Sequence, residues 1–218
     1  MTGVAKFLDT TFSGFDGAMF AFWGNLRCGF LTAVSDVLDV MGSGGIYMIV
    51  LAVILLLFKK TRRFGFAVGI SLIFGAIFTN VILKNAVARL RPYLNPDYKD
   101  LWQAVGGHIE SDLSFPSGHM TATTAGFMAI FFTSKNKLKS LWTAVPILLM
   151  GISRNYLIVH YATDIIAGYF VGVIASVIAV LINKFIWKKL ESSENKFSLF
   201  IKNSDIINLF KKKQKQDK

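Results

Sequence analysis

The stretch GGIYMIVLAVILLLF, residues 44–58, contains no charged side chain, and the basic segment KKTRR follows it at residues 59–63. An apolar run that ends in a cluster of cations is typical of a helix that crosses a bilayer and stops at the headgroups. Hydrophobic residues make up 53% of the 218-residue chain and charged residues 17%, below the ~25% usual in soluble domains. The sequence therefore predicts an integral membrane protein.

Four further apolar runs follow, at residues 64–83, 120–133, 141–152 and 165–187, and their one charged side chain is Lys184 near the end of the last run. Some are shorter than the ~20 residues that a bilayer core requires, so their ends must extend into neighbouring polar segments. Residues 1–41 have an apolar face, but their charges recur too often for a lipid-embedded span, and we expect amphipathic helices lying in the interface. The predicted fold is all-α: a polytopic transmembrane helical bundle of five spans, or six if the N-terminal segment also crosses.

No linker rich in proline, glycine or serine divides the chain, so we expect one membrane-embedded domain over residues 1–190. Within it, residues 1–41 would form the interfacial helices and residues 42–187 the helical bundle. Residues 191–218 are predicted to be a basic cytoplasmic tail, either frayed in water or an amphipathic helix on anionic lipid. The lysines of this tail explain much of the net charge of +11, and no nucleic-acid-binding motif is present, so no nucleic-acid partner is expected.

Basic residues are concentrated in segments 59–63 and 134–139 and in the tail, whereas residues 84–115 balance cations with acids. The positive-inside rule places the basic segments in the cytoplasm. Five alternating spans then bring three polar stretches, which are far apart in the sequence, to the same extracytoplasmic side. Small size and the absence of eukaryotic sorting signals favour a bacterial inner membrane.

These three stretches contain the residues of chemical interest: Lys84 with Arg91 and Pro92; Pro116, Ser117, Gly118 and His119; and Ser153, Arg154, His160 and Asp164. His160 and Asp164 are four residues apart, so on a helix the carboxylate would lie beside the imidazole. Hydrolysis of a phosphate ester needs cations around the phosphoryl oxygens and a nucleophile held in line. The residues therefore predict a site that binds and attacks phosphate.

In order and spacing, the three stretches resemble the signature of the type 2 phosphatidic acid phosphatase family, the lipid phosphate phosphatases. That signature reads Lys-x6-Arg-Pro, then Pro-Ser-Gly-His, then Ser-Arg-x5-His-x3-Asp, and the resemblance extends from about Gly42 to Trp187. Ile158 and Ala162 stand where the family frequently has glycine and proline, but neither is a catalytic position. Many bacterial relatives also begin with a full spanning helix.

The resemblance implies hydrolysis of the terminal phosphate of a lipid phosphate or diphosphate through a phosphohistidine intermediate. His160 would be the nucleophile, Asp164 would fix its tautomer, and His119 would protonate the leaving oxygen and later activate water. The phosphate would be bound by Lys84, Arg91, Ser117, Gly118 and Arg154. No metal or other cofactor is expected, because the cations take its place.

Two other classes compete with this interpretation. A transporter or channel usually has ionisable residues inside its spans, whereas the five runs contain a single charged residue, Lys184, near the end of the last run. A non-catalytic lipid-phosphate-binding protein would need the cations but not His160 or Asp164. The candidate lipids are undecaprenyl diphosphate, phosphatidic acid and phosphatidylglycerol phosphate, entering sideways from the bilayer. Outside the signature, His108 is predicted to be a solvated loop residue and Arg89 an interfacial charge.

Overall fold

The computed structural model describes residues 2–206, and within this range all regular secondary structure is helical, which confirms the predicted all-α fold. The α-helices are α1 Gly3–Thr11, α2 Ser13–Asn25, α3 Gly29–Gly42, α4 Ile46–Leu57, α5 Arg62–Ala76, α6 Lys84–Val87, α7 Pro96–Gln103, α8 Gly118–Thr133, α9 Ala144–Tyr156, α10 Ala162–Ser192 and α11 Lys196–Asn203. Short 3-10 or π segments connect some of them: η1 Ser43–Gly45, η2 Ile77–Leu83, η3 Pro92–Leu94 and η4 Leu138–Thr143.

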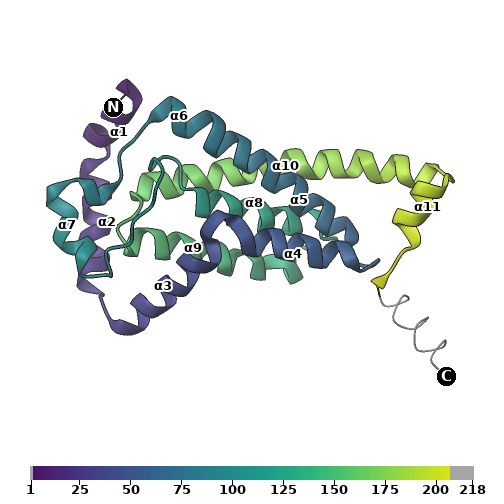
Figure 1. Cartoon of the computed structure of the whole chain (residues 1–218), viewed down its shortest axis with the longest axis horizontal. Coiled ribbons are helices and arrows are strands. Elements are labelled where there is room, and N and C mark those ends of the chain that lie inside the picture. Colours follow the sequence, from purple (N-terminus) through teal and green to yellow (C-terminus); the bar gives the residue numbers. More distant parts are fainter. Residues whose placement is uncertain (1, 207–218) are drawn as a thin grey trace.

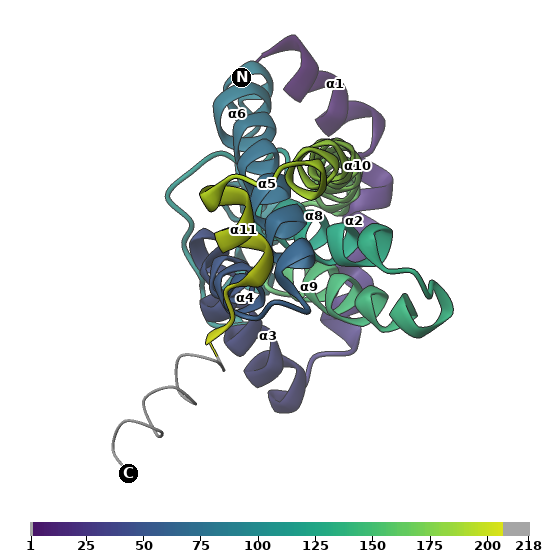
Figure 2. The ribbon, with the colours of Figure 1, turned by 90° about the vertical axis from the view of Figure 1, so that its right-hand side faces the viewer.

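Helix α8 lies at the centre of the bundle, packed against α5, α9 and α10 (Figure 1, Figure 2). Small residues allow this close approach. A Cβ added at Gly172 of α10 would lie 2.6 Å from Cβ of Thr124 and 2.8 Å from the carbonyl oxygen of Thr121, both on α8. Tight contact between the two helices places the start of α10, with Asp164, next to the start of α8, with His119.

Three helical stretches are long and apolar enough to cross a membrane: Gly29–Leu57, Arg62–Leu94 and Ala162–Ser192. They contain three of the five expected spans. The other two fall on α8 and α9, which have 16 and 13 residues. Helices of these lengths measure about 20–24 Å, less than a hydrocarbon core of about 30 Å. Three candidate spans are thus established, and a count of five stays a prediction.

Part of the N-terminal segment differs from the expectation that residues 1–41 form interfacial helices. Helix α3 continues through η1 into α4, so it belongs to the candidate span Gly29–Leu57. Gly44 and Gly45 have φ angles of 59° and 68°, a left-handed conformation that glycine adopts without steric cost, and the chain bends between α3 and α4 there (Figure 1). Interfacial helices remain the prediction for α1 and α2 alone, which pack against α6, α9 and α10.

The N-terminal helices and the C-terminal helix lie at opposite ends of the bundle. Figure 1 shows α1, α2 and α7 at one end, and the turn between α4 and α5 at the other, beside α11. The buried Arg62 ties this turn together, because its guanidinium donates to the carbonyls of Leu56 and Ile201. Helix α11 lies within the predicted tail, so part of this tail is helical. Residues 207–218, which the predicted amphipathic helix would include, lie outside the described residues.

Candidate functional site

The three signature stretches meet at one cavity of about 340 Å³. Five of the predicted site residues line it: Lys84, Arg91, Gly118, His119 and His160. They come from α6, the segment before η3, the first turn of α8 and the loop between α9 and α10. The other three predicted residues, Ser117, Arg154 and Asp164, are fully buried beside or behind these. The structure thus brings together segments that the sequence separates by up to 80 residues, from position 84 to position 164.

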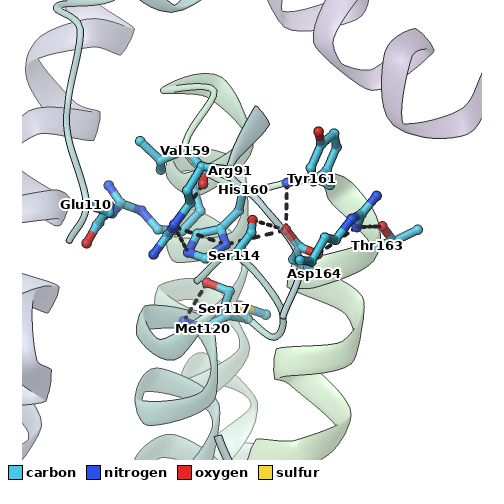
Figure 3. A network of polar contacts seen from close by, with 12 residues as sticks. Arg91, Glu110, Ser114, Ser117, Met120, Val159, His160, Tyr161, Thr163 and Asp164 are labelled. Carbon is cyan, nitrogen blue, oxygen red and sulfur yellow. Dashed lines mark hydrogen bonds and ion pairs between the residues drawn. The ribbon is translucent and has the colours of Figure 1, made fainter. Parts of the chain in front are cut away.

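Hydrogen bonding defines the tautomer of His160. Figure 3 shows its ring between Arg91 on one side and Ser114 and Asp164 on the other. Nη1 of Arg91 lies 2.8 Å from Nε2 of His160 and 3.4 Å from Nδ1; arginine can only donate, so the nearer nitrogen, Nε2, is the better acceptor. The proton of the neutral ring is then on Nδ1, which faces Oδ2 of Asp164 at 3.6 Å. The lone pair of Nε2 therefore points toward a cation of the phosphate site.

The charge state of His160 also suits a nucleophile. Its side chain is buried, and burial, followed by the nearby cations Arg91 and Arg154, holds its pKa well below the ordinary histidine value. The ring is consequently neutral at physiological pH. A neutral imidazole keeps the lone pair that an attack on phosphorus requires.

Asp164 is held on both of its oxygens. Oδ1 accepts from Nη1 of Arg89 at 2.7 Å, while Oδ2 accepts from Oγ of Ser114 at 2.5 Å and from the N–H of Tyr161 at 3.1 Å. The expected helical pairing with His160 is wrong, because α10 begins at Ala162 and His160 lies in the loop before it. The carboxylate caps the helix start and faces the ring from there.

A carboxylate outside the signature pairs with two cations of the cavity. Asp112 accepts from both Lys84 and Arg91. Arg91 is fixed further by the carbonyls of Asp112 and Val159, each at 2.9 Å. Partial burial raises the pKa of Asp112, but the hydrogen bond and charge of Lys84 and those of Arg91 outweigh it, so the pKa lies below the ordinary value. Asp112 is therefore an anion in the place where these cations would meet phosphate.

The third cation, Arg154, pairs with two carboxylates and keeps two of its nitrogens unpaired in the part of the chain that the structure describes. Its Nη1 donates to Asp39 at 2.5 Å and to Glu110 at 3.2 Å. Its Nε and Nη2 are buried and have no hydrogen-bond partner within residues 2–206. Unpartnered buried donors on a guanidinium are costly unless a ligand completes them, and an anion with several oxygens has the geometry to do so.

In the turn before α8, Ser117 is placed differently from Gly118, although both were expected to bind the phosphate. The N–H of Ser117 donates to the carbonyl of Asp164 at 3.1 Å, and Oγ of Ser117 accepts from the N–H of Met120 at 3.4 Å. Ser117 thus joins the starts of α8 and α10 and does not line the cavity. Gly118 does line it, and a Cβ there would lie 3.8 Å from Nζ of Lys84.

One group has the spacing of a metal site. Ligand atoms of Asp39, Glu110 and His119 all lie within 4.8 Å of one another. The cation Arg154 already bonds both carboxylates, and its charge opposes a divalent cation beside it. The donor set therefore fits its arginine better than a metal, and a metal-independent site stays a prediction.

Two predictions outside the signature are wrong. His108 is 25% exposed in its side chain and bridges Asp36 and Asp39, each at 3.0 Å, so it is not a solvated loop residue. Arg89 is 1% exposed and contacts Asp164. The position of Arg89 between Lys84 and Arg91 was the one feature of the sequence that indicated a place in the site. The carboxylates that meet the cavity cations come from α3 and the loop after α7, and no motif marked them.

Comparison with known proteins identifies the family of this chain. The family model of the PAP2 superfamily matches residues 61–188. An undecaprenyl-diphosphatase of Sulfolobus acidocaldarius is 33% identical over 133 residues, which are 59% of this chain and 60% of that protein. Phosphatidylglycerophosphatase B of Bacillus subtilis is 32% identical over 104 residues, which are 44% and 46% of the two chains. This chain therefore spans less than two thirds of the curated relatives that it matches here.

A solved structure has the same fold. The crystal structure of a transmembrane PAP2 type phosphatidylglycerolphosphate phosphatase from Bacillus subtilis aligns with a TM-score of 0.63 at 24% identity, covering 89% of this chain and 93% of that one. The matched family region includes all three signature stretches and every predicted site residue. By its sequence and by the cavity that gathers those stretches, the chain belongs to the PAP2 superfamily.

Proposed function

We propose that the protein is an integral membrane phosphatase that removes the terminal phosphate of a lipid phosphate or diphosphate. The observation that carries this proposal is the cavity in which Lys84, Arg91, His119 and His160 meet. Two cations and two imidazoles lining one cavity suit a phosphoryl group, with one ring to attack and one to protonate. The names of the relatives, which include an undecaprenyl-diphosphatase and a phosphatidylglycerophosphatase, support the same chemistry.

In the proposed reaction Nε2 of His160 attacks phosphorus, and the bond from phosphorus to the leaving oxygen breaks. His119 gives its proton to that oxygen, and Asp164 stabilises the positive charge that forms on the attacking ring. Arg91, Lys84 and Arg154 balance the negative charge on the phosphoryl oxygens. Water, activated by the now neutral His119, then attacks the phosphohistidine, and phosphate leaves.

The substrate would reach the cavity from within the bilayer. Ile49, Leu72 and Ala76 of α4 and α5 line the cavity together with the polar residues, so one wall is apolar. We propose five spans, with α8 and α9 crossing beside the three candidate spans. The basic turns would then lie in the cytoplasm and the cavity would open toward the outside of a bacterial inner membrane. The basic tail would contact anionic lipid on the cytoplasmic side.

The test is phosphate release from purified, detergent-solubilised protein supplied with undecaprenyl diphosphate, phosphatidic acid and phosphatidylglycerol phosphate. EDTA is present throughout, and His160→Ala is the blank. We expect the wild-type protein to release phosphate from at least one lipid and the variant to release none. Binding of lipid phosphate without release would favour a non-catalytic binding protein. Activity that EDTA abolishes and Mg²⁺ restores would assign a metal to Asp39, Glu110 and His119.

A further inference from the structure

A buried arginine outside the signature contacts the residue that faces the attacking histidine. The side chain of Arg89 is 1% exposed, and its three nitrogens all donate: Nε to Asp9 at 2.7 Å, Nη1 to Asp164 at 2.7 Å and Nη2 to Asp16 at 2.9 Å. The guanidinium carbon also lies 3.7 Å from the centroid of the Tyr161 ring. A fork with five donors can satisfy several carboxylates at once in fixed directions, which a lysine cannot do.

Arg89 acts on both oxygens of Asp164. Its side chain binds Oδ1 directly, and its backbone carbonyl accepts from the N–H of Ser114 at 2.9 Å. The hydroxyl of Ser114 in turn donates to Oδ2 of Asp164. With Oδ1 turned to the guanidinium, Oδ2 is the oxygen left toward His160. Arg89 therefore sets the rotation of the carboxylate, and with it the distance from Oδ2 to Nδ1, together with the N–H of Tyr161, from which Oδ2 also accepts.

The N-terminal helices hold Arg89 in this position. Asp9 is on α1 and Asp16 on α2, and Asp16 is 1% exposed. Oδ1 of Asp16 also accepts from the N–H of Thr163 at 3.0 Å, in the first turn of α10. One arginine among three carboxylates leaves the cluster net negative. A negative cluster behind the ring favours the cation that forms when Nε2 attacks.

We propose that Arg89 is a positioning residue of this reaction, held by Asp9 and Asp16, so that α1 and α2 complete the site from outside the matched family region. The inference rests on the proposed phosphatase function. A purely structural buried arginine would affect folding, whereas a positioning residue affects the step in which charge develops on His160. The two roles are separated by kcat, by KM and by the acid limb of the pH profile.

The sign of the pH effect follows from the charges that face His160. These are Asp164 of α10, Arg154 of α9, His119 of α8, and the cations Lys84 and Arg91. Replacing Arg89 with glutamine removes the positive charge that compensates Asp164. The imidazolium form of His160 then becomes easier to form, and the acid limb of kcat/KM moves to higher pH.

The experiment compares Arg89→Gln and Arg89→Lys with Arg62→Gln, using a lipid on which the wild-type protein is active. Arg62 is a matched control, because it is also a buried arginine but binds backbone carbonyls at the other end of the bundle. For Arg89→Gln we expect kcat to fall about 10- to 100-fold, the range typical of losing a group that orients a functional side chain from behind. KM should stay near the wild-type value, and the acid limb should move up. Arg89→Lys should recover part of kcat.

For Arg62→Gln we expect a lower melting temperature with kcat and the pH profile of the wild-type protein. The inference is overturned if folded Arg89→Gln, or Arg89→Lys where only that variant folds, retains wild-type kcat and acid limb. It is also overturned if Arg62→Gln lowers kcat equally. An inactive wild-type protein would instead contradict the proposed function, so the two failures are distinguishable.

Discussion

Replacing Asp112 with asparagine should strengthen phosphate binding. Asp112 bonds Lys84 and Arg91, the two cations that line the cavity, and a substrate phosphate must take its place. Asparagine keeps the size of the side chain and removes the charge that competes with the ligand. The variant therefore tests whether the Asp112 carboxylate opposes phosphate binding or assists the reaction.

The magnitude follows from the exposure of the three partners. The side chains of Lys84 and Arg91 are 7% and 4% exposed, whereas Asp112 is 48% exposed. Hydrogen bonds to charged groups contribute about 1.5–3 kcal/mol, but exposed ion pairs only about 0.2–1 kcal/mol. For a carboxylate that is half in solvent we take an intermediate total of about 1–2 kcal/mol, which corresponds to a factor of about 5–30.

The assay is competitive inhibition by orthophosphate, measured with KM for the lipid substrate in detergent. In Asp112→Asn both constants should fall by that factor. Because the pKa of Asp112 lies below its ordinary value, the carboxylate stays ionised and the ratio to wild type should be constant between about pH 5 and pH 8. Asp100→Asn, an exposed position on α7, is the matched control and should change neither constant. An unchanged or weaker affinity for phosphate in Asp112→Asn would refute the reasoning.

Three further predictions concern the leaving group, the nucleophile and the packing. His119→Ala should reduce turnover of a monophosphate far more than that of a diphosphate. A monophosphate releases an alkoxide, whose conjugate acid has a pKa of about 15.7, whereas a diphosphate releases a phosphate whose second pKa is about 6, so the alkoxide depends more on a proton donor. Equal losses on both substrates would contradict this. The lowered pKa of His160 keeps its ring neutral, so kcat/KM should persist as the pH falls through the ordinary histidine value and decline only at lower pH; an acid limb at the ordinary value would be the contrary result. Gly172→Ala should destabilise the fold by about 1–3 kcal/mol and lower the melting temperature, because the added Cβ would collide with α8. Gly69→Ala on α5 is the control, because its Cβ would enter open space and should leave the melting temperature unchanged. Equal melting temperatures for the two variants would count against tight packing between α8 and α10.

The sequence alone was sufficient for the membrane class, the all-α fold and five of the residues that line the cavity. Long apolar runs that end in cations cross a bilayer as helices, because a helix satisfies its own backbone hydrogen bonds. The residue types and spacing of the three motifs indicate a phosphate site. Spacing misled in one place, because the interval between His160 and Asp164 matches a helical turn although α10 begins between them. Local patterns predict neighbours along a helix but not where that helix starts.

The tertiary structure decided which charges meet. Asp112 on Lys84 and Arg91, Asp39 and Glu110 on Arg154, and Arg89 among its carboxylates are all contacts between distant segments. Single charged residues carry no signal of their partners in the sequence, since a carboxylate at the membrane surface and one inside a site look alike. The packing of α8 against α10 and of α3 against α9, with Ser114 of the loop after α7 bonded to Asp164, sets the distances on which these interactions depend.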